Sequence, residues 1–167
     1  MKNSLTFDFT VNKETNTVQV QKEFAAGLDL VWDAYTKPEL LDQWWAPKPW
    51  LAKTKSMEFK VNGTRLYAMR GPEGEEHWAL ANFTSISPKT NFRYLDAFCD
   101  NEGNINDQLP RSEWNLDFID KGDITLVDIT IKHNALADLE KLIEMGFKEG
   151  FTIALNGLDE LINNWKK

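Results

Sequence analysis

The sequence predicts an α+β fold in which a curved antiparallel sheet wraps around one long C-terminal helix, with two short helices after the N-terminal strands. Three observations support this. Strand-like alternation and turn signals dominate residues 5–24 and 57–131, and a helical period follows Asn134. Strands and helices do not alternate as βαβ units, which excludes a doubly wound parallel sheet. The length of 167 residues fits a single domain spanning 1–167.

The N-terminal segment is expected to form a hairpin followed by two short helices. Residues 5–11 and 18–24 alternate between apolar and polar side chains and are separated by a polar turn. Apolar residues then follow a helical spacing over 28–35, with Asp29 placed to cap the helix. Pro38 suits the first turn of a second helix, which Pro47 ends.

The middle of the chain predicts a meander of strands. Asn62-Gly63 lies between strand-like flanks and predicts a hairpin with a type I′ turn. Further turn signals lie at 71–74, 87–89 and 101–104, and 101–111 is the longest polar connection. Alternation over 113–118 and 124–131 predicts two more strands, each with one buried face.

From Asn134 onwards the pattern predicts one helix of roughly thirty residues with a single apolar stripe. The stripe comprises Leu136, Leu139, Ile143, Phe147, Phe151, Ala154, Leu158, Leu161 and Trp165. Gly146, Gly150 and Gly157 lie along one edge of it. Glycine is unfavourable inside a helix, so these positions indicate close packing of the helix against the sheet, a bend, or a hollow beneath the helix.

Composition excludes several classes of partner. The net charge of −7 and the pI near 4.9 argue against nucleic acids and anionic membrane surfaces. Cys99 is the only cysteine, so no intrachain disulfide can form, and it is interpreted as a small apolar filler. No signal-peptide pattern and no run long enough to span or insert into a membrane is found. A cytoplasmic location is expected.

The residues offer no recognisable catalytic, metal or cofactor site. His77 and His133 fall on different predicted strands without a metal-binding motif, and the motifs of nucleotide binding and of nucleophilic hydrolysis are absent. General acid–base chemistry by His77, Asp96 and Asp128 is the route that remains. We therefore assign no catalytic residue, metal or cofactor and interpret the chain as a protein without enzymatic activity, while a cyclase-like or hydrolase-like enzyme stays open as an alternative.

Several segments together resemble a known superfamily. They are residues 23–26, 31–47 (VWDAYTKPELLDQWWAP), 69–74 (MRGPEG), 96–98 and 144–151 (EMGFKEGF). They resemble the START-like superfamily (SRPBCC, birch-pollen-allergen-like), in particular the AHSA-like branch named after the C-terminal domain of the activator of the ninety-kilodalton heat-shock chaperone's ATPase. The resemblance spans nearly the whole chain and implies the helix-grip fold. It implies no single activity, because members include lipid carriers, hormone receptors, polyketide cyclases and chaperone activators.

The first functional hypothesis is non-catalytic binding of a small hydrophobic or amphipathic molecule in a cavity of a few hundred cubic ångströms between the sheet and the C-terminal helix. Polar groups such as Asp96 would orient the ligand. The candidate ligand-binding residues belong to apolar alternating sets or to the helix stripe: Tyr67, Met69, Phe92, Tyr94, Asp96, Phe98, Trp114, Phe118, Phe147, Phe151 and Ala154. If the opposite face of the strands lined the cavity, Trp78 and Leu80 would replace some of these residues.

A second hypothesis is a stress-response or chaperone-ATPase-activating module that uses its outer surface. A filled core and an exposed patch containing Trp44, Trp45 or Trp50 would favour it. The large apolar content is also compatible with a homodimer.

Overall fold

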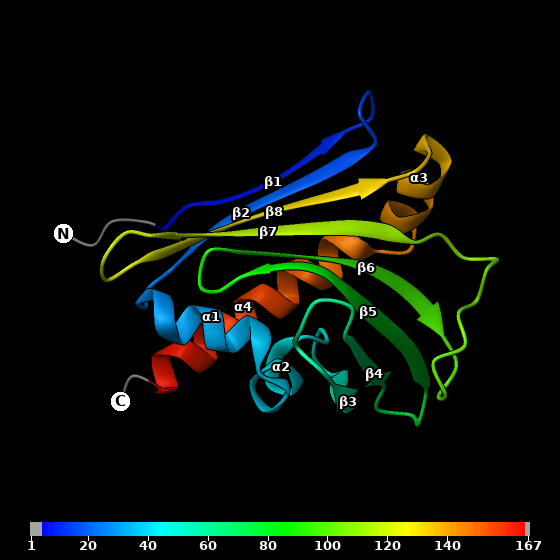
Figure 1. Ribbon diagram of the computed structural model, residues 1–167, viewed down its shortest axis with the longest axis horizontal. Helices are drawn as coiled ribbons and strands as arrows, with labels where there is room; N and C mark the ends of the chain where they lie inside the picture. The colour runs from blue at the N-terminus through cyan, green and yellow to red at the C-terminus, as the bar shows by residue number, and fades with distance from the viewer. Residues whose placement is uncertain (1–4, 166–167) are drawn as a thin grey trace.

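In the computed structural model, which describes residues 5–165, an eight-stranded antiparallel sheet curves around a long helix (Figure 1). This confirms the predicted α+β helix-grip architecture. The elements in chain order are β1 (Phe7–Asn12), β2 (Thr17–Phe24), α1 (Leu28–Thr36), α2 (Pro38–Trp44), β3 (Leu51–Met57), β4 (Thr64–Arg70), β5 (Glu76–Ser87), β6 (Asn91–Cys99), β7 (Ser112–Asp120), β8 (Thr125–His133), α3 (Leu136–Glu144) and α4 (Phe147–Trp165).

The strand order is β1-β2-β8-β7-β6-β5-β4-β3, so β1 and β3 form the two edges of the sheet. Strands from the two ends of the chain meet where β2 pairs with β8, with Val20 opposite Ile129. In β7 and β8 alternate residues are buried, as in the B-i-B-i pattern of β8. The buried set faces the helices because side chains alternate between the two faces of a strand.

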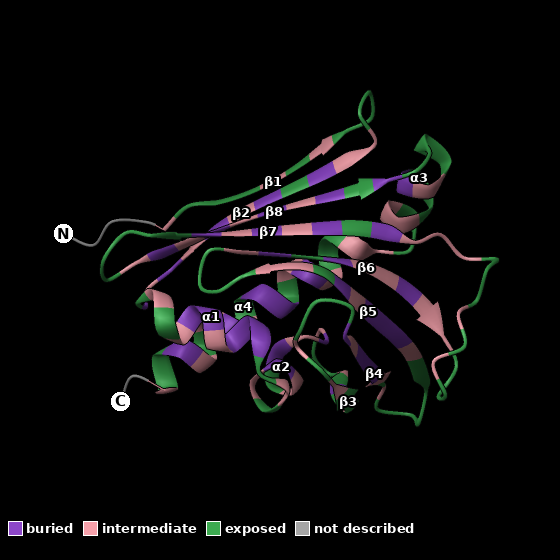
Figure 2. Cartoon of the chain, in the orientation of Figure 1, coloured by how far each residue is buried: buried purple, intermediate pink, exposed green. Residues whose placement is uncertain are grey.

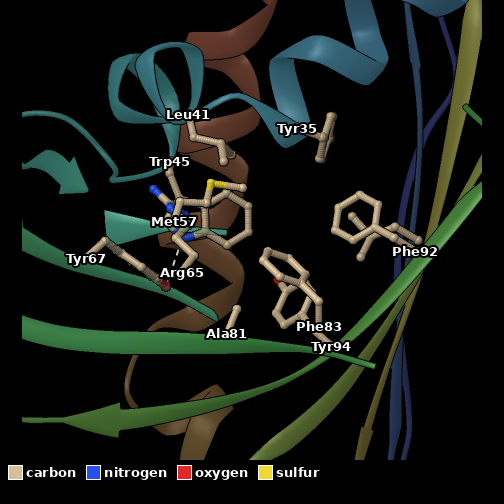
Figure 3. A pocket seen from close by; sticks show the side chains of 11 residues that line it. Tyr35, Leu41, Trp45, Met57, Arg65, Tyr67, Ala81, Phe83, Phe92 and Tyr94 are labelled. Atoms are coloured by element: carbon tan, nitrogen blue, oxygen red, sulfur yellow. Dashed lines mark hydrogen bonds between the residues drawn. The ribbon is translucent and has the colours of Figure 1, made fainter. Parts of the chain in front are cut away.

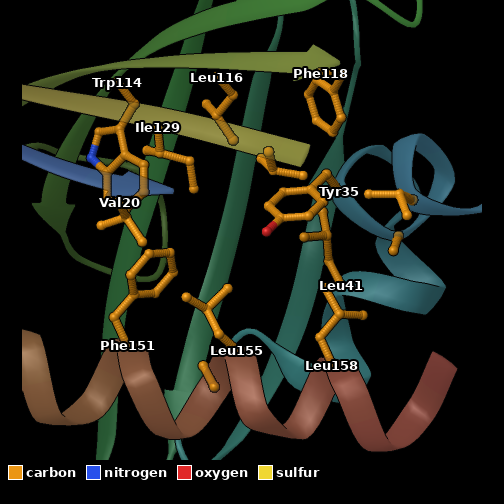
Figure 4. Packing of buried hydrophobic residues seen from close by; sticks show 14 of the residues in the cluster. Val20, Tyr35, Leu41, Trp114, Leu116, Phe118, Ile129, Phe151, Leu155 and Leu158 are labelled. Carbon is orange, nitrogen blue, oxygen red and sulfur yellow. The ribbon is translucent and has the colours of Figure 1, made fainter. Parts of the chain in front are cut away.

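The core lies between the inner face of the sheet and α4. Figure 2 shows the buried residues of α4 on the side that faces the sheet, and Figure 4 shows Phe151, Leu155 and Leu158 pointing toward Leu116 and Ile129. Leu116, Ile129, Leu155 and Leu158 are each at most 1% exposed. Burying a side chain of this size stabilises the fold by about 2 kcal/mol, so this layer fixes the helix against the sheet.

The C-terminal segment forms two helices, where one was expected. α3 ends at Glu144, and Gly146 adopts a φ of 89° before α4 begins at Phe147. Only glycine adopts this left-handed conformation at little cost, and it commonly terminates helices. The apolar stripe continues on both sides of the break, which is why its periodicity does not reveal the break.

The other two helix glycines do not form a hollow beneath the helix. A Cβ on Gly150 would be in ordinary contact with Pro47, and one on Gly157 would meet open space. Gly157 instead lines a groove on the side of α4 that faces α2 and β3.

The connection from β3 to β4 differs from the predicted two-residue hairpin. It spans residues 58–63, and positive φ occurs at Asn62 (71°) but not at Gly63, so the turn is not type I′. Gly63 is needed for another reason, because a Cβ there would collide with the carbonyl oxygen of Glu58. Strand β3 itself was not expected from the pattern.

The cap of α1 also differs from the prediction. Gly27 is the N-cap residue and makes no side-chain cap, while Asp29 lies in the first turn. The Asp29 carboxylate instead pairs with the Lys89 ammonium at 2.7 Å. An acidic residue in the first turn still suits the helix dipole. Pro38 opens α2 as predicted, and the helix ends before Pro47.

A smaller apolar cluster lies on the outer face of the sheet. Leu66, Leu80 and Ala97 form it, with Trp78 and Cys99 packed against them. Residues 100–111 fold back over this cluster, and Asn106 donates its backbone N–H to the Phe98 carbonyl at 2.8 Å. Trp78 and Leu80 therefore lie on the face away from the helix.

Within residues 5–165, none of the helices has the length and apolar content that crossing a bilayer requires.

Candidate functional site

An aromatic cavity lies between the sheet and the two short helices. Its volume is about 30 Å³, which is enough for about two water molecules. Figure 3 shows Arg65, Trp45 and Tyr67 on one side of it and Tyr35 and Phe92 on the other. The full lining consists of Tyr35, Leu41, Trp45, Met57, Arg65, Tyr67, Ala81, Phe83, Phe92, Tyr94 and Leu116.

Strand register explains why these residues meet. Arg65 of β4 lies opposite Ala81 of β5, and Phe83 of β5 lies opposite Tyr94 of β6. All four share the inner face because alternate residues of a strand point to the same side. The small side chain of Ala81 leaves room beside the guanidinium of Arg65. The short helices close the other side, Tyr35 coming from α1 and Leu41 from α2.

Arg65 is the unusual residue of this site because its side chain is only 5% exposed. Its Nε donates to Thr54 Oγ1 at 3.2 Å, and its Nη2 donates to Asp42 Oδ1 at 3.4 Å. The guanidinium carbon lies 4.0 Å from the centre of the Tyr67 ring and 5.9 Å from that of Trp45. Burial lowers the pKa of Arg65, while the nearby Tyr67 and Asp42 favour its charged form. These contacts hold a cation beside an aromatic cavity.

Two tyrosine hydroxyl groups also belong to this lining. Tyr67 accepts a hydrogen bond from Trp45 Nε1 at 3.0 Å. Within residues 5–165, neither the Tyr67 nor the Tyr94 hydroxyl hydrogen has an acceptor, and the buried hydroxyl of Tyr35 has no partner at all. Burial raises the pKa of Tyr67 and of Tyr94, so both remain protonated donors at neutral pH.

The candidate residues from the sequence fall into three groups. Tyr67, Phe92 and Tyr94 line the cavity. Asp96, Phe98 and Met69 are partly buried and share the inner-face parity of these residues. The rest pack in the main core between sheet and α4: Trp114, Phe118, Phe151 and Ala154, with Phe147 against its edge.

The cavity is much smaller than the expected few hundred cubic ångströms. Rings fill the space, since Phe92 packs against Trp32 and Phe118 with ring centres 5.6 and 5.9 Å apart. Tyr94 stacks on Trp114 at 5.4 Å. The surplus of aromatic residues in the composition therefore fills the core in this conformation.

The three residues considered for acid–base chemistry lie apart. Asp96 accepts hydrogen bonds from Ser112 and from Trp114 Nε1 at 3.0 Å, and burial raises its pKa. Asp128 accepts from glutamine side chains on the outer face. His77 is exposed and stacks on Trp50 at 5.4 Å. In the described part of the chain no hydrogen bond joins them, and no cluster of three potential metal-ligating residues is present.

Sequence reasoning missed Arg65, Trp45 and Tyr35 as site residues. A charged residue in a strand is ordinarily assigned to the solvated face, which is why Arg65 was passed over. Its position in the strand could have identified it, because Arg65, Tyr67 and Met69 are alternate residues of the same strand and therefore share one face.

Both the sequence and the fold resemble those of known proteins. The profile of the family "Activator of Hsp90 ATPase homolog 1-like protein" matches residues 25–163. No curated protein matches.

Among solved structures, protein Ms6760 of Mycobacterium smegmatis is 28% identical, with a TM-score of 0.86 over 95% of this chain and 96% of that chain. A protein of Arthrobacter aurescens is 26% identical, with a TM-score of 0.89 over 94% and 91%. An AHSA1 protein of Silicibacter pomeroyi shares the fold at 17% identity, with a TM-score of 0.68 over 88% and 97%.

Proposed function

Since the chain belongs to the family of activator of Hsp90 ATPase homolog 1-like proteins, we propose that it is a non-catalytic binding protein for a small amphipathic molecule. The site is the aromatic cavity between the sheet and the short helices. One observation carries the proposal: the Tyr35, Tyr67 and Tyr94 hydroxyl groups line the aromatic cavity, and none of their hydrogens has an acceptor within residues 5–165. Buried polar groups are nearly always paired, so unpaired donors beside a cavity mark the place where a ligand oxygen would bind.

A ligand larger than water must displace side chains to enter. The connection between β3 and β4 is suited to this, because β3 is an edge strand with an irregular register between Thr54 and Ser56. Met57 lines the cavity at the end of β3, and Phe59 covers Phe83 and Phe92 at ring distances of 5.0 and 5.3 Å. Movement of this connection would open the cavity while leaving the layer between sheet and α4 in place.

The test uses 2-naphthol, an aromatic molecule with one hydroxyl group, and follows the quenching of tryptophan fluorescence. Ala81→Leu places a larger side chain in the cavity and is expected to weaken 2-naphthol binding at least about tenfold, at a stability cost of about 1–3 kcal/mol. Ala137→Leu, on the exposed side of α3, is the control for the added apolar group and should bind as the wild type does. Absence of wild-type binding, or equal binding by Ala81→Leu, would contradict the proposal.

The natural ligand can be sought in parallel. Native mass spectrometry of the protein purified from its own cells should reveal a reproducible small-molecule adduct. The same molecule added to the apo protein should raise the unfolding temperature, because a ligand that binds only the folded state stabilises it.

A second candidate function, activation of the ATPase of Hsp90, is favoured by an exposed apolar groove. Trp50, Leu51, Ile153 and Gly157 line this groove between the start of β3 and α4, and Leu51 and Ile153 are 66% and 45% exposed. Of the tryptophans expected in such an exposed patch, Trp50 lines the groove and is partly exposed, Trp44 lines it but is only 2% exposed, and Trp45 lines the cavity.

This function predicts that the protein accelerates ATP hydrolysis by Hsp90 of its own source. Leu51→Asp should abolish that acceleration, whereas Val61→Asp, an exposed apolar residue away from the groove, should not. No acceleration by the wild type would exclude this function. A cytoplasmic location accompanies both proposals.

A further inference from the structure

Arg65 shares its carboxylate partner with Thr54. Within residues 5–165 its ion pair, to Asp42 Oδ1, is 3.4 Å long, which exceeds the 2.7–2.9 Å of a strong charge-assisted hydrogen bond. The same Asp42 oxygen already accepts the Thr54 hydroxyl at 2.6 Å and its backbone N–H at 3.0 Å. Asp42 therefore binds Thr54 more closely than Arg65, while its charge still favours the charged guanidinium.

Arg65 also retains donors. Its Nε and Nη2 have acceptors, but none is found for Nη1 within residues 5–165. Asp96 is the other carboxylate near the site, and its oxygens accept hydrogen bonds from Ser112 and Trp114. A guanidinium ordinarily satisfies all its N–H groups when it is buried, so the Nη1 donor without an acceptor marks a place where a ligand oxygen could bind.

We propose that the cavity selects a ligand with one anionic oxygen group, such as a carboxylate, which the Arg65 guanidinium binds with the Tyr67 and Tyr94 hydroxyls. This inference rests on the proposed function and specifies the chemical class of its ligand. Each of the three residues lines the cavity, and each has a donor hydrogen without an acceptor in the described chain. The Tyr67 and Trp45 rings hold the guanidinium plane in place, so its donors are fixed before the ligand arrives.

One negative charge fits this site better than two. Arg65 is the only cationic residue among the lining residues, and the remainder are aromatic or aliphatic apart from the tyrosine hydroxyls. Asp42 already lies beside Arg65, so a dianionic phosphate would bring more buried negative charge than this guanidinium can balance. A monoanion attached to a planar apolar body would bind Arg65 and place that body among Phe83, Phe92 and Leu116.

The experiment compares two probes of the same ring size, 2-naphthoate and 2-naphthamide, by titration of tryptophan fluorescence and by calorimetry. The wild type should bind 2-naphthoate about ten- to a hundredfold more tightly than 2-naphthamide, the range expected for hydrogen bonds to a charged group. Arg65→Gln should remove this preference and retain binding of 2-naphthamide. Arg70→Gln removes the same charge from the exposed end of β4, where Arg70 pairs with Glu76, and should retain the preference.

Tyr94→Phe provides a second variant that does not depend on how Arg65→Gln folds. It keeps the ring and removes the hydroxyl, so the preference for 2-naphthoate should fall several-fold. Circular dichroism verifies folding of each variant.

The possible outcomes separate the two proposals. Equal wild-type affinity for both probes, or a preference that persists in both Arg65→Gln and Tyr94→Phe, would overturn the anion inference and leave the binding function standing. Failure of the wild type to bind either probe would overturn both.

Discussion

At the scale of single residues, His133 shows a second kind of unpaired buried polar group. Its side chain lies at the end of β8, the residue is 2% exposed, and neither ring nitrogen has a partner within residues 5–165. Burial lowers the pKa of His133, while the nearby Asp138 acts in the opposite direction. Unlike Arg65, this residue does not line the aromatic cavity, so its consequence concerns stability.

His133 should make the protein sensitive to mild acid. Below a pH of about 6.5 the unfolded state binds a proton that the folded state resists, so the free energy of unfolding should fall as the pH decreases through this window. His133→Leu should flatten this dependence in urea unfolding measured between pH 7.5 and 5.5. His77→Leu, which alters an exposed imidazole, serves as the control and should behave as the wild type. An equal pH dependence in wild type and His133→Leu would refute this role.

At the scale of elements, the break between α3 and α4 can be tested by substituting two glycines that differ in backbone conformation. Gly146 has a φ of 89°, whereas Gly157 lies in the interior of α4 with open space where a Cβ would stand. Gly146→Ala should destabilise the protein by about 1–2 kcal/mol, because alanine is strained in the left-handed region. Gly157→Ala should stabilise it by about 0.5–1 kcal/mol through helix propensity. Urea unfolding measures both, and destabilisation by the two variants alike would show that the break is not set by Gly146.

The accuracy of sequence reasoning varied by element for physical reasons. Strands β7 and β8 were predicted because one face of each is buried, which produces a clear alternation. Strand β3 was missed because the residues that alternate with Lys53 and Lys55 are small or polar (Ala52, Thr54 and Ser56), so the sequence shows no apolar face there. The break at Gly146 was missed because the apolar spacing is continuous across it.

The candidate site was predicted in part. Tyr67, Phe92 and Tyr94 were identified as cavity residues because parity within a strand is a local property. Arg65 was not, because its burial depends on the rings of Tyr67 and Trp45, and Trp45 comes from a distant part of the sequence. Whether these residues bind a ligand stays a prediction.

At the scale of the whole molecule, all eight strands form one sheet around one main core. The protein should therefore unfold in a single cooperative transition, consistent with one domain over residues 1–167. Far-ultraviolet circular dichroism and tryptophan fluorescence should give the same midpoint in urea. Two separated midpoints would contradict the single-domain prediction.

The pairing of β2 with β8 also has a consequence during synthesis on the ribosome. Val18 and Val20 are fully buried in the folded protein, yet the strand that pairs with β2 begins at Thr125, about a hundred residues later. Until that strand has left the exit tunnel, the N-terminal hairpin carries an unpaired edge and an uncovered apolar face, which are features that promote aggregation. Closure of the sheet must therefore wait until β8 (Thr125–His133) has left the tunnel, and until then the nascent chain is vulnerable to self-association.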